Sequence, residues 1–265
     1  MNDVSTQACR LAKMSAKKSP VILLFDLETM PNLVRTWRKW EQNVIWYERY
    51  GYIWSISWKY LGEKKVYHKN LTDFPLYKKD KFSDRSLVEF IWNLVNEADI
   101  CIAHNGNAFD LKMITGRFIH YKLTPPQPYK KIDTKLLYKM YLNEDSNSLK
   151  DICLKHNLPH KLETGGEMLW ELCEKGDRKA IKKMAEYNNG DVIALEAAYK
   201  LILPYITNHP NLGLMNGDKV ACPNCGSKNV QRRGFNLTRT SKAQRWQCRD
   251  CYSWHSSPLK GGQLR

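Results

Sequence analysis

Apolar and polar positions along the chain follow two periods, and together they predict a mixed α/β domain. Continuous apolar runs and alternation with a period of two predict strands, whereas apolar residues recurring every three to four positions predict helices. Strands are expected in five stretches: Val21 to Thr29, Tyr52 to Tyr60, Lys64 to His68, the start of Ile100 to Asp110, and the K-K-I-D-T run that contains Asp133. The second and third are expected to pair as a hairpin.

Helical periodicity follows in six further stretches: Asp84 to Ala98, Phe109 to Tyr121, Thr134 to Leu142, Ser148 to His156, Gly166 to Glu174, and Asp177 to Ile206. Asp177 is expected to cap the longest helix, and Pro204 is expected to bend or end it, because proline lacks a backbone donor. The triplet Asn188-Asn189-Gly190 contains poor helix formers, which predicts a local bend there.

Two acidic residues close the first predicted strand. Side chains alternate across a strand, so Asp26 and Glu28 emerge on the same face of the sheet. Two carboxylates side by side at the end of a buried strand repel each other unless a cation or a proton compensates. The pattern therefore predicts a divalent metal site.

Two more blocks offer partners for this acidic pair. Asp110 follows the predicted strand at Ile100, in the run H-N-G-N-A-F-D, where a helix is expected to begin. Tyr187 and Asp191, in Y-N-N-G-D, lie one turn apart on a single helix face. The chain therefore offers four carboxylates and one phenol in three separate blocks.

These three blocks resemble the motifs of the DEDD exonuclease superfamily, whose fold is ribonuclease H-like. Tyr187 stands four residues before Asp191, as in the DEDDy branch, while Glu186 holds the position where the histidine branch carries its base. The strings H-N-G-N-A-F-D and Y-N-N-G-D-V also resemble the YprB-type ribonuclease H-like group. The resemblance covers Pro20 to Tyr205 and implies a mixed sheet flanked by helices.

The resemblance also implies a DnaQ-like 3′–5′ exonuclease that acts on DNA, preferably at single-stranded ends, and releases nucleoside 5′-monophosphates. It implies two Mg²⁺ or Mn²⁺ ions, hard cations that prefer carboxylate and phosphate oxygens. Asp26 would contact both ions, Glu28 and Asp191 would complete the first site, and Asp110 would support the second. Tyr187 would orient the attacking water, because a phenol with a pKa of about 10 is a poor bulk base.

The eight cysteines fall into two groups. Two C-x-x-C pairs about twenty residues apart are typical of a structural tetrahedral zinc site, and they consist of Cys222, Cys225, Cys248 and Cys251. His255 is an alternative ligand, and two disulfides are the alternative to a metal, less favoured without a secretory signal. The remaining four are expected to be reduced core residues: Cys9, Cys101, Cys153 and Cys173.

Charge favours a polyanionic partner. The chain carries 42 basic and 27 acidic residues, a net charge of +15, and the segment from Asp218 onward carries ten basic and two acidic residues, a net charge of +8. The cysteine-rich segment resembles zinc ribbons of DNA-handling proteins. Its expected nucleic-acid contacts are Arg232, Arg233, Lys242, Arg245 and Trp246. A protein-binding ribbon remains the alternative.

Further nucleic-acid contacts are expected nearer the acids. Aromatic and basic residues interleave from Trp37 to Tyr60, where Trp37, Trp40 and Trp46 are candidates for base stacking and Trp54 and Trp58 for the core. Met30 holds the place where relatives wedge an apolar side chain against the terminal base. Asn105 is either a phosphate contact or an ordinary Asn-Gly turn. His104 is expected to be structural, and Asp133 is expected to cap a helix or end a strand.

The expected organisation is a basic tail at residues 1–19, an exonuclease domain at 20–206, a linker at 207–217, a zinc ribbon at 218–257 and a tail at 258–265. No apolar run is long enough to cross a bilayer, and a cytoplasmic location is expected. A replication or repair protein is an expected partner. The alternatives kept open are an exoribonuclease, a structure-specific nuclease, and a non-catalytic module that recruits nucleic acid.

Overall fold

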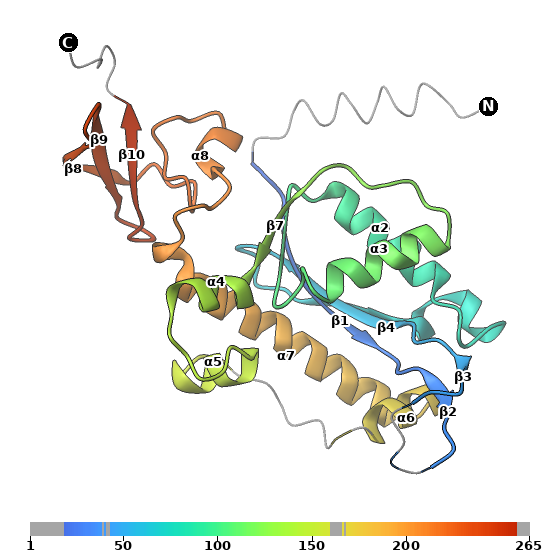
Figure 1. Ribbon diagram of the computed structural model, residues 1–265. Helices are drawn as coiled ribbons and strands as arrows, with labels where there is room; N and C mark the ends of the chain where they lie inside the picture. Colours follow the sequence, from blue (N-terminus) through green and yellow to red (C-terminus); the bar gives the residue numbers. More distant parts are fainter. Residues whose placement is uncertain (1–18, 39, 41–42, 160–165, 167, 259–265) are drawn as a thin grey trace, which may run out of the picture. The chain divides into compact units, whose positions relative to one another are not determined.

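The computed structural model describes residues 19–38, 40, 43–159, 166 and 168–258 (Figure 1). The chain divides into two compact units, one formed by Ile22–Lys200 and the other containing Leu201 and the residues after it. Apart from Ser19 and Pro258, the tails predicted at 1–19 and 258–265 lie outside the described residues, as does Cys9.

The larger unit contains a five-stranded mixed sheet, which confirms the predicted fold class. Its strands are β1 (Ile22–Thr29), β4 (Ile53–Tyr60), β5 (Tyr67–Asn70), β6 (Ile100–Ala103) and β7 (Lys130–Asp133), in the order β5-β4-β1-β6-β7. The β1 strand pairs antiparallel with β4 and parallel with β6. It is therefore the central strand, and its end is where the acidic pair stands.

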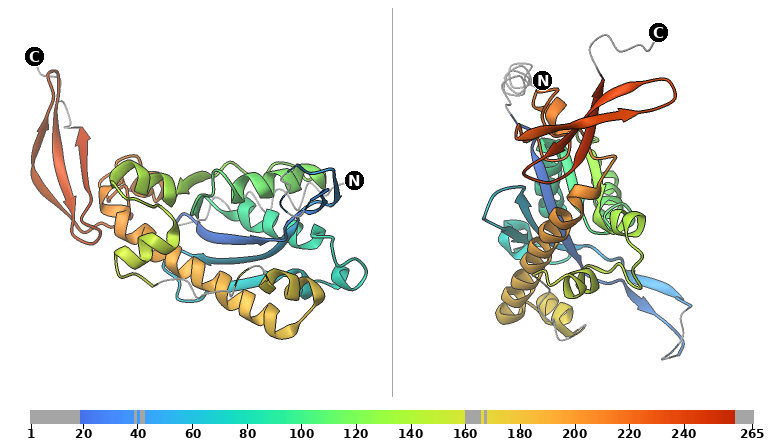
Figure 2. Two further views of the ribbon diagram at one scale, coloured as in Figure 1. Left: turned by 60° about the horizontal axis from the view of Figure 1, so that its bottom comes forward. Right: turned by 90° about the vertical axis from the view of Figure 1, so that its left-hand side faces the viewer.

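Helices flank this sheet on both faces. They are α2 (Arg85–Glu97), α3 (Asp110–His120), α4 (Thr134–Tyr141), α5 (Leu149–Lys155), α6 (Met168–Lys175) and α7 (Arg178–Ile202), with short 3₁₀ turns at Leu71–Asp73, Pro75–Lys78 and Leu203–Tyr205. The α2 and α3 helices lie over one face, and α7 runs along the other (Figure 1, Figure 2). The six predicted helices are all present, with ends that shift by a few residues.

The two faces of β1 differ in chemistry because its side chains alternate. Leu23, Phe25 and Leu27 belong to the main hydrophobic core, together with apolar residues of α2 and α3 such as Ile91 and Ile114. Asp26 and Glu28 lie on the opposite face. The strand thus fixes two acids on a rigid, buried element, which holds their geometry better than a loop would.

Residues of β4 extend this polar face, and α7 covers it. Ser55 and Ser57 are cross-strand partners of Glu28 and Asp26, and both serines are fully buried. The Ser57 hydroxyl donates to Asn189 Oδ1 at 2.8 Å. Lys59, further along the same face, pairs with Glu196 of α7 at 2.5 Å. The interface between sheet and helix is therefore built from hydrogen bonds as well as apolar contacts.

The α7 helix begins after its predicted cap and ends at Ile202, four residues before the predicted end at Ile206. Asp177 caps it, because its Oδ1 accepts the Ala180 N–H at 2.8 Å, and Pro204 lies in the 3₁₀ turn that follows Ile202. The helix continues unbroken through Asn188-Asn189-Gly190. These poor helix formers are accommodated because the two asparagine side chains hydrogen-bond to the β1 and β4 strands.

Several elements were not predicted from the sequence. A two-stranded hairpin, β2 (Leu33–Arg35) and β3 (Trp46–Arg49), follows β1 directly. In the second unit, α8 (Leu212–Met215) precedes a three-stranded antiparallel sheet of β8 (Val230–Leu237), β9 (Lys242–Cys248) and β10 (Trp254–Pro258), in the order β10-β9-β8. None of the helices in the described residues is long and apolar enough to span a membrane.

Candidate functional site

Three of the predicted acids come together at the end of β1. Carboxylate oxygens of Asp26, Glu28 and Asp191 all lie within 4.8 Å of one another. Asp26 is partly exposed, whereas Glu28 and Asp191 retain 8% and 2% exposure. The β1 strand and the α7 helix therefore converge on one acidic cluster, although Asp26 and Asp191 are 165 residues apart in the sequence.

Tyr187 lies one turn before Asp191 on α7, as its spacing predicts. Its side chain is 8% exposed, and its ring packs edge-on against Trp170 of α6 with 6.2 Å between centroids. Packing of this kind restricts the ring to few orientations. The phenol is therefore presented from a fixed position on the same helix as Asp191.

Asp110 contacts the β1 strand from helix α3. It occupies the first turn of α3 and is 3% exposed, and its Oδ1 accepts the N–H of Leu27 at 3.2 Å. Leu27 lies between Asp26 and Glu28, so the fourth acid binds the backbone at the residue between the two acids of the pair. The pKa of Asp110 is raised to about 6, mainly by burial and to a smaller extent by the charge of Asp133, while the backbone N–H groups of Asp110 and Leu27 oppose the shift.

Asn188 belongs to the site and was missed by the sequence analysis. Its Nδ2 donates to Asp26 Oδ2 at 2.8 Å and to the Asp26 carbonyl at 3.3 Å, while its Oδ1 accepts from Ser55 Oγ at 3.4 Å. The side chain is fully buried. A bond to one carboxylate oxygen fixes the orientation of the other, so Asn188 positions Asp26.

The donor set of the acidic cluster fits divalent cations. Three carboxylates within 4.8 Å concentrate negative charge in a mostly buried site, and oxygen-only donors match Mg²⁺ or Mn²⁺ rather than a soft metal. Cys173 lies near Glu28 and Cys153 near Asp191, but burial raises the pKa of these thiols to about 12 and about 11. Neither sulfur belongs to the group of ligand atoms that meet in the acidic cluster.

Two residues between β6 and α4 have structural partners. Asp133 caps α4 by accepting the N–H groups of Lys135 and Leu136, as predicted, and it also accepts those of Asn105 and Asn107 at 3.0 Å. Asn105 has a φ of 65°, in the left-handed region. Its backbone therefore forms a turn held by Asp133.

His104 and Met30 are also held by the fold. The two ring nitrogens of His104 hydrogen-bond to Thr134 Oγ1 and to the Asn147 carbonyl, in agreement with the expected structural role. Met30, expected to wedge against a base, is 2% exposed and packs in the hydrophobic core. Its N–H bonds to the Tyr52 carbonyl, which draws the chain after β1 inward, so the structure does not present Met30 to a ligand.

The tryptophans between Trp37 and Tyr60 fall into a buried and an exposed group, as predicted. Trp54 and Trp58 of β4 are 1% and 7% exposed, whereas Trp37, Trp40 and Trp46 are 82%, 85% and 59% exposed on the β2–β3 hairpin. The sequence could not show that these exposed tryptophans share one hairpin.

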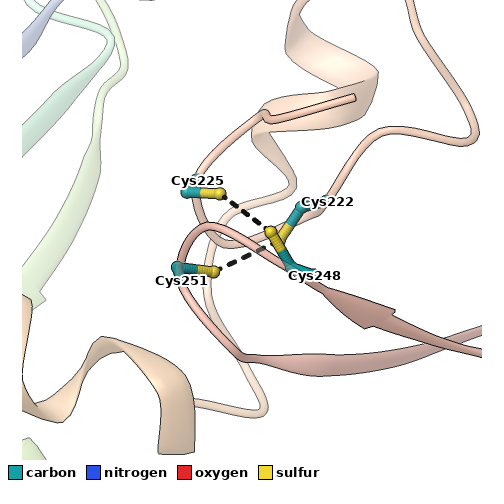
Figure 3. Close-up of side chains that lie close together, drawn as sticks. All are labelled: Cys222, Cys225, Cys248 and Cys251. Atoms are coloured by element: carbon teal, nitrogen blue, oxygen red, sulfur yellow. Dashed lines mark hydrogen bonds between the residues drawn. The ribbon is translucent and has the colours of Figure 1, made fainter. Parts of the chain in front are cut away.

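The four cysteines of the second unit form one cluster (Figure 3). The Sγ atoms of Cys222 and Cys251, and those of Cys225 and Cys248, lie 3.6 Å apart, and all four thiols fall within 4.8 Å. Disulfide sulfurs would be about 2.05 Å apart. Four sulfurs about 2.3 Å from a tetrahedral zinc ion would be about 3.8 Å from one another, so the cluster is compatible with a zinc ribbon.

Both C-x-x-C pairs adopt the same turn. The N–H of Cys222 bonds to the Ser227 carbonyl at 2.8 Å, and the N–H of Cys248 bonds to the Ser253 carbonyl at 2.9 Å. The residue after the second cysteine has positive φ in each, 73° at Gly226 and 63° at Tyr252. Glycine is favoured at position 226 by this positive φ, and a Cβ there would lie 2.9 Å from Nδ2 of Asn216, the end of a flexible side chain.

The predicted basic contacts of the ribbon do not share one surface. Arg232 and Trp246 are cross-strand partners, with the guanidinium 5.3 Å from the indole ring, and Lys242 lies on the same face of β9. Arg245 points to the opposite face, where it lies over Trp254 at 5.2 Å. Arg233 falls at the bulge in β8. The ribbon therefore exposes cation–aromatic pairs on both faces.

The mixed sheet and its acids define a nuclease-type RNase H fold. The chain belongs to the RNase H superfamily, whose family model matches residues 48–203. This range contains Asp110, Tyr187 and Asp191 and begins after the acidic pair of β1.

A DNA polymerase of known structure is similar to this chain in fold. The family B DNA polymerase of the hyperthermophilic archaeon Pyrobaculum calidifontis is similar in fold, with a TM-score of 0.52 and 13% identity, over 74% of this chain and 26% of the polymerase chain. The chain thus corresponds to about a quarter of that polymerase. No curated protein sequence matches it.

Proposed function

We propose that this protein is a metal-dependent 3′–5′ exonuclease of the DEDDy type that hydrolyses DNA. The observation that carries the proposal is the convergence of Asp26, Glu28 and Asp191 within 4.8 Å, with Tyr187 one helical turn from Asp191. The similarity to a DNA polymerase supports a nucleic-acid substrate, and the net charge of +15 supports a polyanion.

The acids would hold two Mg²⁺ or Mn²⁺ ions, with Asp26 contributing to both, Glu28 and Asp191 to one, and Asp110 to the other. Such ions stabilise the charge that develops on phosphate and lower the pKa of bound water. Tyr187 orients the attacking water through its hydroxyl. Asn188 keeps one Asp26 oxygen engaged, so that the other faces the cluster. The product is a nucleoside 5′-monophosphate.

The ribbon would hold one structural zinc ion through its four cysteines, and its exposed cations would contact phosphate. Zinc at such a site supplies folding energy and no open coordination position. Arg232, Lys242 and Trp246 are the contacts on one face, and Arg245 is the contact on the other. Asn105, near Asp110 in the sequence, would contact the scissile phosphate.

The test is digestion of matched DNA and RNA oligonucleotides, single-stranded and duplex, labelled separately at each end. Stepwise shortening of 5′-labelled DNA in Mg²⁺ or Mn²⁺ is expected, with loss in EDTA and in Asp26→Ala. Asp145→Ala is the matched control, because Asp145 is an exposed aspartate outside the cluster. Absence of any cleavage by the wild-type protein with retained binding would replace this proposal with a recruiting module.

A further inference from the structure

The two ends of the β2–β3 hairpin pack against each other just after the end of β1, the strand that carries Asp26 and Glu28. Its first strand starts at Leu33, four residues after β1 ends at Thr29. The Gly51 N–H bonds to Asn32 Oδ1 at 2.6 Å, and a Cβ at Gly51 would lie 2.6 Å from the Met30 carbonyl oxygen, so the two ends of the hairpin pack closely. Extended chain covers about 3.5 Å per residue, so Leu33, five residues after Glu28, lies within about 18 Å of it.

An ion pair ties the base of the hairpin to α6. Arg49 of β3 pairs with Glu174, which also accepts the Tyr52 hydroxyl at 3.0 Å, and the Arg49 guanidinium lies 4.2 Å from the ring of Phe82. The α6 helix carries Trp170, the residue that packs against Tyr187. The hairpin is therefore a fixed extension of the domain beside the site.

The hairpin exposes an unusual concentration of aromatic side chains. Their exposed fractions are 82% for Trp37, 85% for Trp40, 59% for Trp46, 45% for Tyr47 and 69% for Tyr50. Residues of this size are usually buried, and clustered exposed aromatics mark a binding surface. The hydrophobic core does not depend on these rings, because aromatic residues of β4 pack in it instead.

The charges of the hairpin favour nucleic acid as the occupant. Among its described residues from Leu33 to Tyr50, Arg35, Arg38 and Arg49 are cationic and Glu48 is the acid. The Arg35 guanidinium lies 5.8 Å from the Trp46 ring while it pairs with Glu48. Cations interleaved with exposed aromatic rings form the usual platform for single strands, where bases stack and phosphates meet positive charge.

We propose that the β2–β3 hairpin binds unpaired nucleotides by base stacking on Trp37, Trp40 and Trp46, which makes single-stranded or frayed ends the preferred substrate. The inference rests on the proposed function, since it assigns the substrate class of the same site. Bases inside a duplex already stack on one another, so their faces are closed to these rings. An unpaired strand offers every base face and can pass from the hairpin to the acids.

The test measures binding without hydrolysis. In the full-length Asp26→Ala background, the double variant Trp37→Ala/Trp40→Ala is titrated with fluorescein-labelled oligothymidylate and with a blunt duplex, followed by anisotropy. Affinity for the single strand is expected to fall between about 5-fold and about 150-fold for each stacked base lost. Affinity for the duplex is expected to change less than twofold.

Two controls accompany the measurement. Tyr205→Ala removes an aromatic side chain that is 65% exposed outside the hairpin, and its single-strand affinity should match that of the parent. Thermal unfolding should be unchanged in the double variant, because both tryptophans are almost fully exposed.

Unchanged single-strand affinity, or an equal loss for the duplex, would overturn the proposal. A shift of the parent from oligomer to monomer in the double variant, with DNA affinity retained, would also overturn it and identify the hairpin as a protein interface. Because the assay needs no turnover, a result for the hairpin stands whether or not the wild-type protein digests DNA.

Discussion

Asn188 is the residue whose role can be tested most directly. Its amide donates to Asp26 at 2.8 Å, so Asn188→Asp would place a second carboxylate against the first. Two carboxylates at this distance hold a proton between them, which competes with a metal ion. We expect the Mg²⁺ concentration for half-maximal cleavage to rise about tenfold, an effect that lessens as the pH is raised. Initial rates across a Mg²⁺ series at pH 6.5 and 8.5 measure both.

The neighbouring residue supplies the matched control. Asn189 uses its Oδ1 to accept the Ser57 hydroxyl, a role that a carboxylate oxygen also fills. Asn189→Asp should therefore keep the wild-type Mg²⁺ dependence. Equal Mg²⁺ requirements in Asn188→Asp and the wild type would show that Asn188 does not position Asp26 for metal binding.

Among single residues, the sequence predicted those that are brought together by a short spacing within one strand or one helix. Asp26 and Glu28 share a strand face, and Tyr187 and Asp191 share a helix face, so their short spacings suffice. Asn188 could not be found in this way, because its partner lies 162 residues earlier in the chain. Met30, expected to wedge against a base, is buried, and its position depends on the backbone bond to Tyr52, another nonlocal contact.

The ion pair between Lys59 and Glu196 joins two elements of the site. Lys59 of β4 and Glu196 of α7 are 5% and 8% exposed, and α7 carries Tyr187 and Asp191. Removing one member leaves a buried charge unpaired, which costs about 3–5 kcal/mol. Glu196→Ala should lower the free energy of unfolding of the larger unit by this amount, as measured by urea denaturation.

Two further variants distinguish the stability contributed by the buried Lys59–Glu196 pair from that of the exposed Lys200–Glu196 pair. Glu196 also pairs with Lys200 at 2.8 Å, but the Lys200 side chain is 58% exposed, so Lys200→Ala should cost less than about 1 kcal/mol. The double replacement Lys59→Met/Glu196→Leu should recover most of the stability, since neither charge remains. A loss in Lys200→Ala as large as in Glu196→Ala would contradict a special role for the buried pair.

Among elements, the six helices and the strands of the main sheet were predicted, whereas the β2–β3 hairpin and the strands of the ribbon were not. The four residues of β6 form a buried apolar run that can be recognised, whereas β3, also with four residues, and β8, with eight, are mostly exposed and have no such run. The alternation of β4 predicted a strand with one polar face, which ordinarily faces water. Ser55 and Ser57 are instead buried, because the asparagines of α7 satisfy them. Strand periodicity cannot show what covers a polar face.

For the whole molecule, the two compact units predict separable responses to metal removal. The second unit buries few apolar side chains, Leu212 and Ala221 among them, and its four cysteine sulfurs meet within 4.8 Å. A zinc ion bound by these sulfurs would contribute to the folding free energy of the ribbon, and removing the ion would remove that contribution. A zinc-selective chelator should therefore unfold the ribbon and leave the Ile22–Lys200 unit folded, because that unit has its own core.

Limited proteolysis of the full chain, followed by mass spectrometry, measures this response. Cleavage after chelation is expected within residues 219–258, and fragments spanning Ile22–Lys200 should survive as they do before treatment. Cys248→Ser should give the same pattern without chelator, while Cys101→Ser, at a buried cysteine outside the cluster, should not. Cleavage of both units after chelation would show that their stabilities are coupled. If elemental analysis finds no zinc bound to the protein, the ribbon does not hold the proposed metal ion. Loss of the ribbon alone would mean that the metal stabilises the ribbon without contributing to the fold of the larger unit, which carries the acids.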